Sequence, residues 1–270
     1  MNEFPIDHDL HCHTFVSGCS LDPEQNPAAI LAFAKAHGYT AMCTTDHLWD
    51  PAAPGVFTCY KRQTMELQKS ILPLPREDGI RFEFGCETEW RGIVDGKPTL
   101  GLAPEHYGDF GFIIVPPNHF HFRPHVRPDD CDTPQKVAEL LVTRLEELQE
   151  LPLPWEKVGI AHMNCGLLFK EGRPSDVFDA IDEDRYRAAM RFFAEKGAGI
   201  ELNCSSFGNP DFAEHPESHF RLFRMAKDEG CRFYLGSDAH HPAELMDVPN
   251  RAPAIVEALG LEAQHLYRMP

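Results

Sequence analysis

Short apolar runs alternate along the chain with longer stretches in which apolar residues recur at helical spacing. The short runs predict seven strands, at residues 6–11, 39–44, 80–85, 110–115, 157–161, 199–203 and 232–235. The longer stretches predict helices at residues 28–37, 57–72, 134–148, 184–195, 217–229 and 252–259. Residues 90–108 are rich in glycine and proline, so we expect an irregular segment there.

The alternation of strands with helices predicts an α/β fold built from parallel βαβ units. Seven units can close into a distorted (β/α)7 barrel, whereas an open doubly wound sheet would spread the strand ends along a line. Side chains of metal-ligand type follow six of the strands, and they converge only if the strands form a ring. We therefore predict a barrel with its site at the C-terminal strand ends. No linker is evident, which favours one domain spanning residues 1–270.

The chain carries 25 basic and 42 acidic residues, a formal net charge of −17. That balance disfavours binding to long nucleic acid, which depends on neutralising many phosphates. Its nine cysteines are odd in number and form no CxxC pair, which favours a reducing, cytoplasmic setting. The N-terminal residues have no basic segment and no long apolar stretch, so we expect neither a signal peptide nor a membrane span.

The candidate chemistry begins with the segment Asp9-Leu10-His11-Cys12-His13-Thr14. Alternate side chains of a strand share a face, so the two imidazoles project together, as ligands of a divalent metal do. An HxH pair alone is a weak signal, and its recurrence with similar residues strengthens it. Ligand-type residues also close later apolar runs, at Asp46, His47, Glu87, His119, His162, Asp238 and His240. This mixture of imidazoles and carboxylates suits zinc, manganese or iron.

Several of these positions have neighbours that fit nearly as well. Glu89 and His121 repeat the spacing two residues after Glu87 and His119, so either could be the ligand instead. Asp46 adjoins His47 and is interpreted as an orienting group or proton acceptor rather than a direct ligand.

Taken together, the motifs resemble those of the polymerase-and-histidinol-phosphatase (PHP) superfamily of metal-dependent phosphoesterases. The matching pieces are Asp9–Thr14, Thr45-Asp46-His47, Gly85-Cys86-Glu87, His119, Ala161-His162 and Gly236-Ser237-Asp238-Ala239-His240. They follow the order of the family over residues 9–240. The resemblance implies a distorted seven-unit β/α barrel that holds two or three divalent metal ions.

Carried over by position, the resemblance implies three sets of ligands. His11, His13, Glu87 and Asp238 would bind one metal, and Glu87 would bridge to a second bound by His119 and His162. His47 and His240 would bind a third. Family members often add a further His or Asp to the third site. Here that region reads Ser17-Gly18-Cys19-Ser20-Leu21-Asp22, so either Cys19 or Asp22 completes the site, or the site is weak.

The predicted function is hydrolysis of a phosphoric ester by a hydroxide held between the metals, with Asp46, Asp238 and His240 as catalytic residues. The expected substrate is a small phosphorylated metabolite, most simply a monoester similar to histidinol phosphate. In so acidic a chain its phosphate needs positive partners. The candidates are Arg123, Arg127, Lys170 and Arg173, and for each of them a solvated loop charge is the competing interpretation.

Two other functions compete with this one. A phosphodiesterase or exonuclease acting on nucleotides would keep the metals and change the bond. A catalytically idle, metal-binding regulatory domain would keep the fold alone, although eight candidate ligands exceed the four that a structural zinc needs. The identity of the substrate, the native metal and the oligomeric state do not follow from the sequence.

Overall fold

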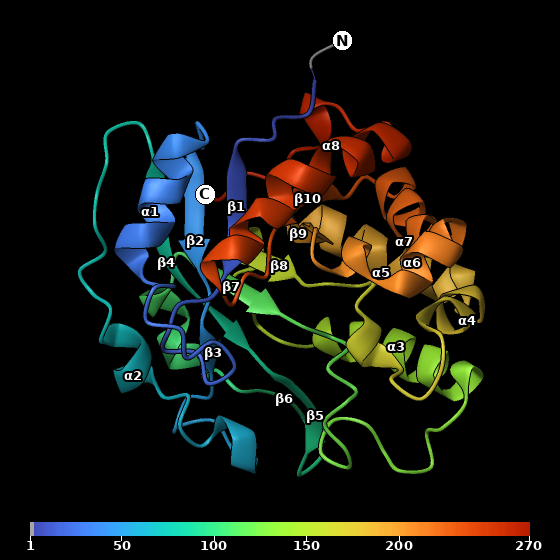
Figure 1. The fold of residues 1–270 in the computed structure, drawn as a ribbon. Coiled ribbons are helices and arrows are strands. Elements are labelled where there is room, and N and C mark those ends of the chain that lie inside the picture. The colour runs from blue at the N-terminus through green and yellow to red at the C-terminus, as the bar shows by residue number, and fades with distance from the viewer. Residues whose placement is uncertain (1–2) are drawn as a thin grey trace.

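Seven parallel strands form the central sheet of the protein, for which a computed structural model describes residues 3–270. Met1 and Asn2, at the start of the predicted domain of residues 1–270, lie outside the described residues. The strands follow one another in the order β1 (His8–Cys12), β2 (Ala41–Thr44), β4 (Arg81–Thr88), β7 (Phe112–Val115), β8 (Val158–Ile160), β9 (Gly199–Asn203) and β10 (Arg232–Gly236) (Figure 1). The two-residue strand β3 (His47–Leu48) pairs beside the end of β4.

The first and last strands of this sheet lie side by side and nearly close it. The amide of Asp238 donates to the carbonyl oxygen of His11 over 2.7 Å, and the amide of His13 donates to that of Ala239 over 2.9 Å. These bonds join the end of β1 to the segment that follows β10. The predicted distorted (β/α)7 barrel is therefore confirmed.

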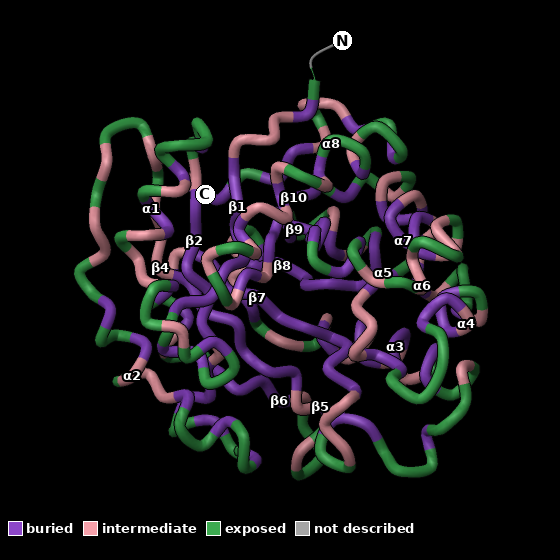
Figure 2. The backbone as a smooth tube through the Cα atoms, in the orientation of Figure 1, coloured by how far each residue is buried: buried purple, intermediate pink, exposed green. Residues whose placement is uncertain are grey.

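Helices surround the sheet. Their outer sides face solvent, and the strands that they cover are the most buried part of the chain (Figures 1 and 2). They are α1 (Pro27–Ala36), α2 (Met65–Lys69), α3 (Pro134–Leu148), α4 (Pro174–Asp179), α5 (Glu183–Lys196), α6 (Pro210–Glu214), α7 (Pro216–Asp228) and α8 (Asp247–Leu259). Sequence signals located most of their ends. The Asn26 side chain caps α1 by accepting from the amide of Ala29, and Gly197 ends α5 in a left-handed conformation with φ of 79°.

The single helix predicted over residues 57–72 is wrong. The segment forms a 3-10 turn at Thr58–Tyr60 and the separate short helix α2, which is capped by the Thr64 side chain. Contacts with the barrel override the helical periodicity. The Tyr60 hydroxyl donates to Glu89 over 2.9 Å, and the Gln68 side chain donates to the carbonyl oxygen of Asp46.

The irregular segment predicted over residues 90–108 is also wrong, because it contains an antiparallel hairpin. Strands β5 (Trp90–Val94) and β6 (Lys97–Leu100) are joined by Asp95 and Gly96, which have φ of 50° and 76°. An Asp-Gly pair with both residues left-handed is the preferred two-residue hairpin turn, so a recognisable signal was present. The short helices α4 and α6 were likewise not predicted.

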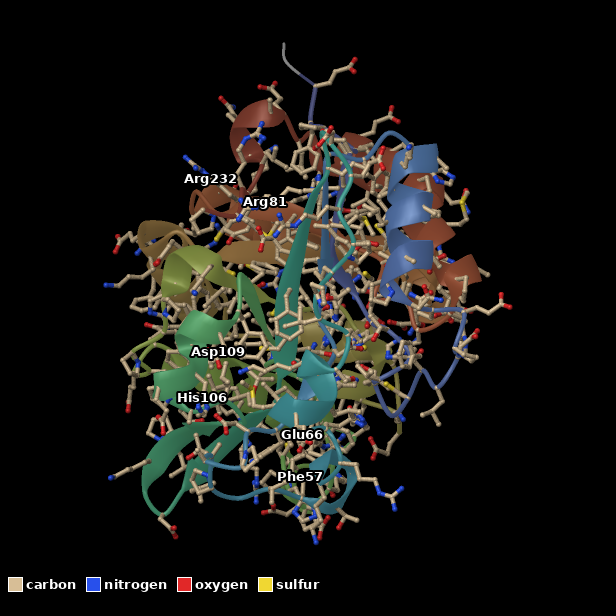
Figure 3. The ribbon with its side chains drawn as sticks, turned by 90° about the vertical axis from the view of Figure 1, so that its left-hand side faces the viewer. Phe57, Glu66, Arg81, His106, Asp109 and Arg232 are labelled. Carbon is tan, nitrogen blue, oxygen red and sulfur yellow. The ribbon has the colours of Figure 1, made fainter. Side chains whose placement is uncertain are left out.

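The barrel interior is divided into an apolar half and a polar half. Near the strand starts, one buried cluster contains Leu10, Cys43, Phe112, Ile114 and Tyr234 from the strands and Tyr267 and Met269 from the C-terminal segment. Gly159 is required there, since a Cβ at that position would lie 2.4 Å from the Tyr234 hydroxyl. Figure 3 shows Arg81 and Arg232, which begin β4 and β10, toward the same end of the molecule, with Phe57 at the opposite end. Since the apolar cluster occupies the end where the strands start, the polar half lies at the C-terminal strand ends.

Two further features concern the cysteines and the lengths of the helices. All nine cysteines are unpaired, and six of them are buried. Across residues 3–270, the structure contains no helix with the length and apolar character needed to span a bilayer.

Candidate metal centre

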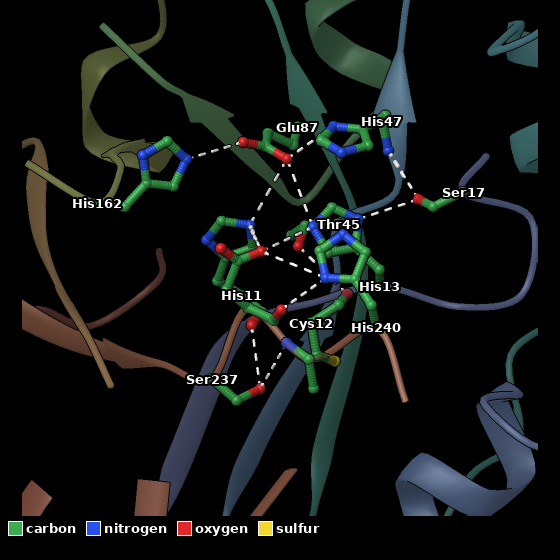
Figure 4. A network of polar contacts seen from close by, with 12 residues as sticks. His11, Cys12, His13, Ser17, Thr45, His47, Glu87, His162, Ser237 and His240 are labelled. Carbon is green, nitrogen blue, oxygen red and sulfur yellow. Dashed lines mark hydrogen bonds and ion pairs between the residues drawn. The ribbon is translucent and has the colours of Figure 1, made fainter. Parts of the chain in front are cut away.

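Ligand-type side chains from six strand ends gather around Glu87, which lies near the end of β4 (Figure 4). They form three groups. The first cluster contains His11, His13 and Asp238 and faces one oxygen of Glu87, the second cluster contains Glu87, His119 and His162, and the outer cluster contains His13, His47 and His240. The structure thus brings together all eight residues predicted as metal ligands.

In the first cluster four ligand atoms surround a common point. Nε2 of His13 lies 3.1 Å from Oδ1 of Asp238 and 3.4 Å from Oε2 of Glu87. Nε2 of His11 lies 3.4 Å and 3.7 Å from the same two oxygens. Tetrahedral ligands of zinc, at the usual zinc–nitrogen and zinc–oxygen distances, are about 3.3 Å apart. The spacing therefore fits a divalent ion.

The second cluster uses the other oxygen of Glu87. Oε1 lies 3.2 Å from Nε2 of His162 and 3.7 Å from Nε2 of His119. Because Oε2 faces the first cluster, the carboxylate lies between the two groups and is placed to bridge two ions. Figure 4 shows this arrangement, with Glu87 between His162 and His47 and with His11 and His13 below it.

The outer cluster is more open. The side chains of His47 and His240 are 18% and 23% exposed, whereas those of His11 and Glu87 are 0% and 1% exposed. Nδ1 of His47 lies 2.8 Å from Oε2 of Glu87, so this cluster adjoins the first. The imidazole of His240 stacks on that of His13 with ring centroids 4.1 Å apart.

In most of the imidazoles, Nδ1 contacts a second protein group on the side away from the centre. Nε2 is then left facing the centre. Nδ1 of His11 donates to Glu201 over 2.8 Å, and Nδ1 of His119 donates to Glu89 over 2.8 Å. Similar Nδ1 contacts join His162 to Asn118 at 3.0 Å, His13 to Ser17 at 3.0 Å and His240 to the carbonyl oxygen of Asp238 at 2.8 Å. Such contacts orient histidines for metal binding.

An ionised carboxylate and unsatisfied ligand atoms at the centre fit a bound cation. Burial opposes ionisation of Glu87, but the facing imidazoles of His47, His11 and His162 outweigh it and hold the pKa of Glu87 well below its usual value. Nε2 of His11 is buried without a hydrogen-bond partner, and Oε2 of Glu87, although it lies 2.8 Å from Nδ1 of His47, accepts no hydrogen bond of suitable geometry. Buried polar atoms are almost always satisfied, so two unsatisfied ligand atoms aimed at one point fit a metal ion.

The backbone is strained at two of the ligands. His162 and Asp238 have φ of 29° and 55°, in the left-handed region that costs a residue other than glycine about 1–3 kcal/mol. Each directs its side chain into the barrel just beyond a strand end. Such strain persists where the surrounding structure enforces it, and it is typical of functional sites.

The alternative candidates lie behind the centre. Glu89 accepts from His119 and from the Tyr60 hydroxyl, and it therefore supports a ligand. His121 belongs to none of the three clusters. Burial of its side chain and the nearby His119 lower the pKa of His121 to about 3. Asp46 accepts from the Thr14 amide over 2.7 Å and from the Ser17 hydroxyl over 2.7 Å, which favours its interpretation as an orienting group.

Sequence reasoning missed Glu201, the group behind His11. Its carboxylate is fully buried in β9, where it also accepts from the amide of His162 over 2.6 Å. Gly236 makes room for it, since a Cβ at that position would lie 2.0 Å from Oε1 of Glu201. A glutamate in the middle of an apolar strand was the available signal, because a buried carboxylate needs a partner.

The centre opens onto a pocket of about 510 Å³, within the usual range for small ligands. Asp238 and His240 form part of its wall, together with residues from the loops after β8, β9 and β10. Among the four predicted phosphate-binding side chains, Lys170 lines this pocket.

The three arginines have other partners. Arg123 and Arg127 both donate to the carbonyl oxygen of Cys131 over 2.7 Å and lie 3.5 Å and 3.0 Å from Glu171. Arg127 is 1% exposed. These contacts tie the loop after β7 to the loop that carries Lys170. Arg173 pairs with Asp176 on the surface at 2.9 Å. A direct role of the arginines in phosphate binding stays a prediction.

Comparisons with known proteins agree with this geometry. No known family profile matches the chain. A probable phosphatase of Caldicellulosiruptor bescii is 23% identical over 241 residues, covering 89% of this chain and 82% of the relative. A probable phosphatase of Vibrio atlanticus is 24% identical over 233 residues, covering 86% and 77%.

Two solved structures have a similar fold. Histidinol phosphate phosphatase from Lactococcus lactis, complexed with zinc, L-histidinol and phosphate, superposes with a TM-score of 0.57 at 15% identity, covering 97% of this chain and 98% of the other. A candidate histidinol phosphatase from Listeria monocytogenes gives 0.59 at 12% identity, covering 88% and 97%. The resemblance predicted from the motifs is therefore confirmed in the fold.

Proposed function

We propose that this protein is a metal-dependent hydrolase that removes phosphate from a small phosphorylated metabolite, most simply a monoester similar to histidinol phosphate. The observation that carries the proposal is a set of three ligand clusters around Glu87 and His13, two of whose members, Asp238 and His240, line a pocket of about 510 Å³. A pocket of that size suits a metabolite better than a polymer.

The residues present fit two or three divalent ions, of zinc, manganese or iron. His11, His13, Asp238 and Glu87 would hold one ion, Glu87, His119 and His162 a second, and the outer cluster a third. When bound, such ions supply Lewis-acid chemistry, since they polarise phosphoryl oxygens and make water a stronger nucleophile at neutral pH.

The chain itself contributes orientation, charge and shape. Asp238 and His240 reach from the centre into the pocket wall, and in this proposal they are the catalytic residues closest to the ester. Asp46 acts through Ser17, whose hydroxyl contacts both Asp46 and Nδ1 of His13, and is a positioning residue. Lys170 at the pocket binds substrate phosphate as a point charge.

The arginines complete the proposed substrate site less directly. Arg123 and Arg127 hold the Lys170 loop through Glu171, and either would bind phosphate if it exchanged that partner. If they do bind phosphate, alanine at each position lowers kcat/KM by about one to two orders of magnitude. An effect within about twofold at both positions would leave phosphate recognition to the metals and to the loop of Lys170 and Arg173.

The proposal includes no long nucleic acid and no membrane among the partners. The net charge of −17 weighs against a polyanionic partner. We also propose a cytoplasmic setting, because the nine cysteines are all unpaired.

Hydrolysis of matched synthetic esters tests the function. Protein stripped with a chelator and reloaded with zinc or manganese is assayed on p-nitrophenyl phosphate, a monoester, and on bis(p-nitrophenyl) phosphate, the diester. We expect metal-dependent turnover of the monoester, slower turnover of the diester and none without metal. L-histidinol phosphate is then the first natural compound to assay, since the Lactococcus lactis structure holds its two products.

The other two functions give different results in the same assay. Preference for the diester would favour a phosphodiesterase. Metal binding with no turnover of any phosphorylated compound would favour an idle regulatory domain, and the proposal would be wrong.

A further inference from the structure

The pocket beside the metal centre has a wall of hydrogen-bonding groups. Apart from the two ligands of the centre, its polar side chains come from the loops after β8, β9 and β10 and are Lys170, Ser205, Ser206, Asn209 and Glu244. Among residues 3–270, none that lines the pocket is Phe, Tyr or Trp, and Leu167 is its one large apolar side chain. The wall therefore offers hydrogen bonds rather than a surface on which a planar ring could stack.

Glu244 places a fixed hydrogen-bond acceptor in this wall. It lies in the 3-10 turn Pro242–Met246, which follows β10. Its Oε2 accepts from the amides of His240 and His241, over 2.7 Å and 3.1 Å. Within residues 3–270, no donor is hydrogen-bonded to its Oε1. The backbone thus holds one oxygen of the carboxylate, and the other is available to a ligand in the pocket.

Asn209 places a fixed donor in the same wall. Its Oδ1 accepts from the amide of Asp211 over 2.8 Å and so caps α6. Its Nδ2 lies close to Gly166, another residue of the pocket, where a Cβ would be only 2.5 Å from that nitrogen. Across the part of the chain that the structure describes, Nδ2 donates to no protein acceptor. The cap fixes which end of the amide is free, so this position offers an N–H group.

A hydroxyl group suits this pairing better than an ammonium group. A hydroxyl both donates and accepts, so neighbouring hydroxyls of one ligand satisfy Glu244 and Asn209 together. An ammonium group has no acceptor for the Asn209 amide, and its charge is opposed by Lys170, which lines the same wall. A second phosphate would be opposed by the carboxylate of Glu244. The two fixed groups therefore favour an uncharged, hydroxyl-bearing ligand.

We propose that the pocket selects the phosphate monoester of a polyol or sugar, whose hydroxyl groups bind to Glu244 and Asn209. This inference rests on the proposed function; it keeps the small monoester and specifies the alcohol. The ester group itself lies at the metal centre. Glu244 and Asn209 are therefore specificity residues, and their effect on rate appears with substrates that carry hydroxyl groups.

Matched esters test the assignment on the zinc-loaded protein. α-Glycerol phosphate and n-propyl phosphate share a carbon skeleton and differ in their hydroxyl groups, and O-phosphoethanolamine carries an ammonium group instead. We expect kcat/KM for α-glycerol phosphate to exceed that for each of the others by about 10- to 100-fold, the range for one hydrogen bond to a charged group. Equal values, or a preference for O-phosphoethanolamine, would overturn the assignment.

Two isosteric variants reverse the wall and keep the caps. In Glu244→Gln the amide oxygen still accepts from the two backbone amides, so a donor replaces the acceptor that faces the pocket. In Asn209→Asp one carboxylate oxygen keeps the cap of α6, and an acceptor replaces the donor. The measurement is the ratio of kcat/KM for α-glycerol phosphate to that for n-propyl phosphate, in which effects on the shared phosphate cancel.

We expect this ratio to fall about tenfold or more in each variant. It should be unchanged in the control Glu217→Gln, at an exposed position on α7. A loss shared equally by both esters would leave the ratio constant, would indicate a purely structural role for the two residues and would overturn the assignment.

Binding measurements separate this inference from the proposed function. The phosphonate analogues of the two esters, in which a methylene group replaces the ester oxygen, cannot be hydrolysed, and calorimetry on the zinc-loaded protein measures their affinities. If neither ester is hydrolysed but the dihydroxy phosphonate binds about tenfold more tightly than its alkyl analogue in the wild type and not in Glu244→Gln, the assignment stands and the proposed function fails. If both esters are hydrolysed at the same kcat/KM, the proposed function stands and the assignment fails.

Discussion

The two inner clusters and the outer cluster differ in how the chain holds their ligands. The inner ligands lie in strands or directly after them, and buried carboxylates such as Glu201 and Glu89 hold His11 and His119 from behind. In the outer cluster, the side chains of His47 and His240 are 18% and 23% exposed. The inner clusters are therefore enclosed by the barrel, and the outer cluster opens toward solvent.

This difference indicates different tasks for the two regions. Ligands set by a barrel strand and a buried partner cannot move without disturbing the fold, so the inner clusters are preorganised and should bind metal tightly. The partly exposed side chains of His47 and His240 are more accessible to water and to a chelator. The outer site should therefore lose its metal first when chelator is added, and it is the region where metal identity can be adjusted.

The largest effect is expected from removing a ligand charge of the first cluster. Asp238→Asn preserves volume but removes the negative charge opposite His11 and His13. We expect the fold to persist and kcat/KM to fall at least about 100-fold, or ~2.7 kcal/mol of barrier. Steady-state assays with circular dichroism check this. Asp228→Asn, at an exposed position on α7, is the control, and a variant with a tenth of wild-type activity would exclude Asp238 as a ligand.

A smaller effect is expected from changing the support of the inner clusters. Glu201→Gln leaves every ligand in place but weakens the contact that fixes His11. We expect inner-site zinc affinity to fall about 10- to 100-fold, with activity partly restored by excess zinc. The zinc affinity of the outer cluster should be unchanged. Competition with a chromophoric chelator measures the affinity, and equal loss at both regions would contradict the distinction drawn between them.

A still smaller effect is expected from changing the charge of the pocket wall. Lys170→Ala removes a positive charge from the wall without touching a metal ligand, so KM should rise about tenfold while kcat stays within about threefold. Arg173→Ala is the matched control, because its guanidinium pairs with Asp176 on the surface. Indistinguishable effects of the two substitutions would mean that substrate phosphate is recognised without Lys170.

The smallest effect is a change in the pH dependence of one thiol. In metal-free protein, partial burial of the Cys19 thiol raises its pKa. The neighbouring imidazoles of His240 and His47 have the larger, opposite effect and lower the pKa of Cys19 to about 6. The pKa of Cys59 is raised by burial. Since only the thiolate reacts, alkylation of Cys19 by iodoacetamide should rise through pH 6 and level off above it, while that of Cys59 keeps rising past pH 9.

Peptide mass spectrometry after timed alkylation follows both cysteines in one sample. Loading with zinc should protect Cys19 and leave Cys59 reactive. Equal protection of the two, or a common pH profile, would show that Cys19 has no special environment.

Sequence patterns located the candidate ligands because residues of ligand type follow the apolar runs that form the strands. His11, His13, Glu87 and Asp238 each follow or close an apolar run, and the parallel topology brings such ends together whatever the details of the helices. The seven strands and the long helices were predictable for the same reason. Their apolar residues recur with a clear period over enough positions to be recognised.

What was missed depends on contacts between distant segments. Glu201 supports His11 from a strand 190 residues away, and nothing near either residue indicates the pairing. The helix predicted over residues 57–72 breaks because Tyr60 and Gln68 bond to the barrel. From the sequence, Arg127 was predicted to bind phosphate or to be a solvated loop charge. In the structure it is buried against Glu171 and the carbonyl oxygen of Cys131. Local periodicity contains none of this information.

Anomalous diffraction at the zinc edge, from crystals of protein purified without chelator, would locate the bound metal ions themselves. We expect one peak among His11, His13, Asp238 and Glu87 and a second among Glu87, His119 and His162. A third, weaker peak is expected among His13, His47 and His240. Zinc-replete crystals with no peak at the two inner clusters, or with peaks only elsewhere on the protein, would contradict this expectation.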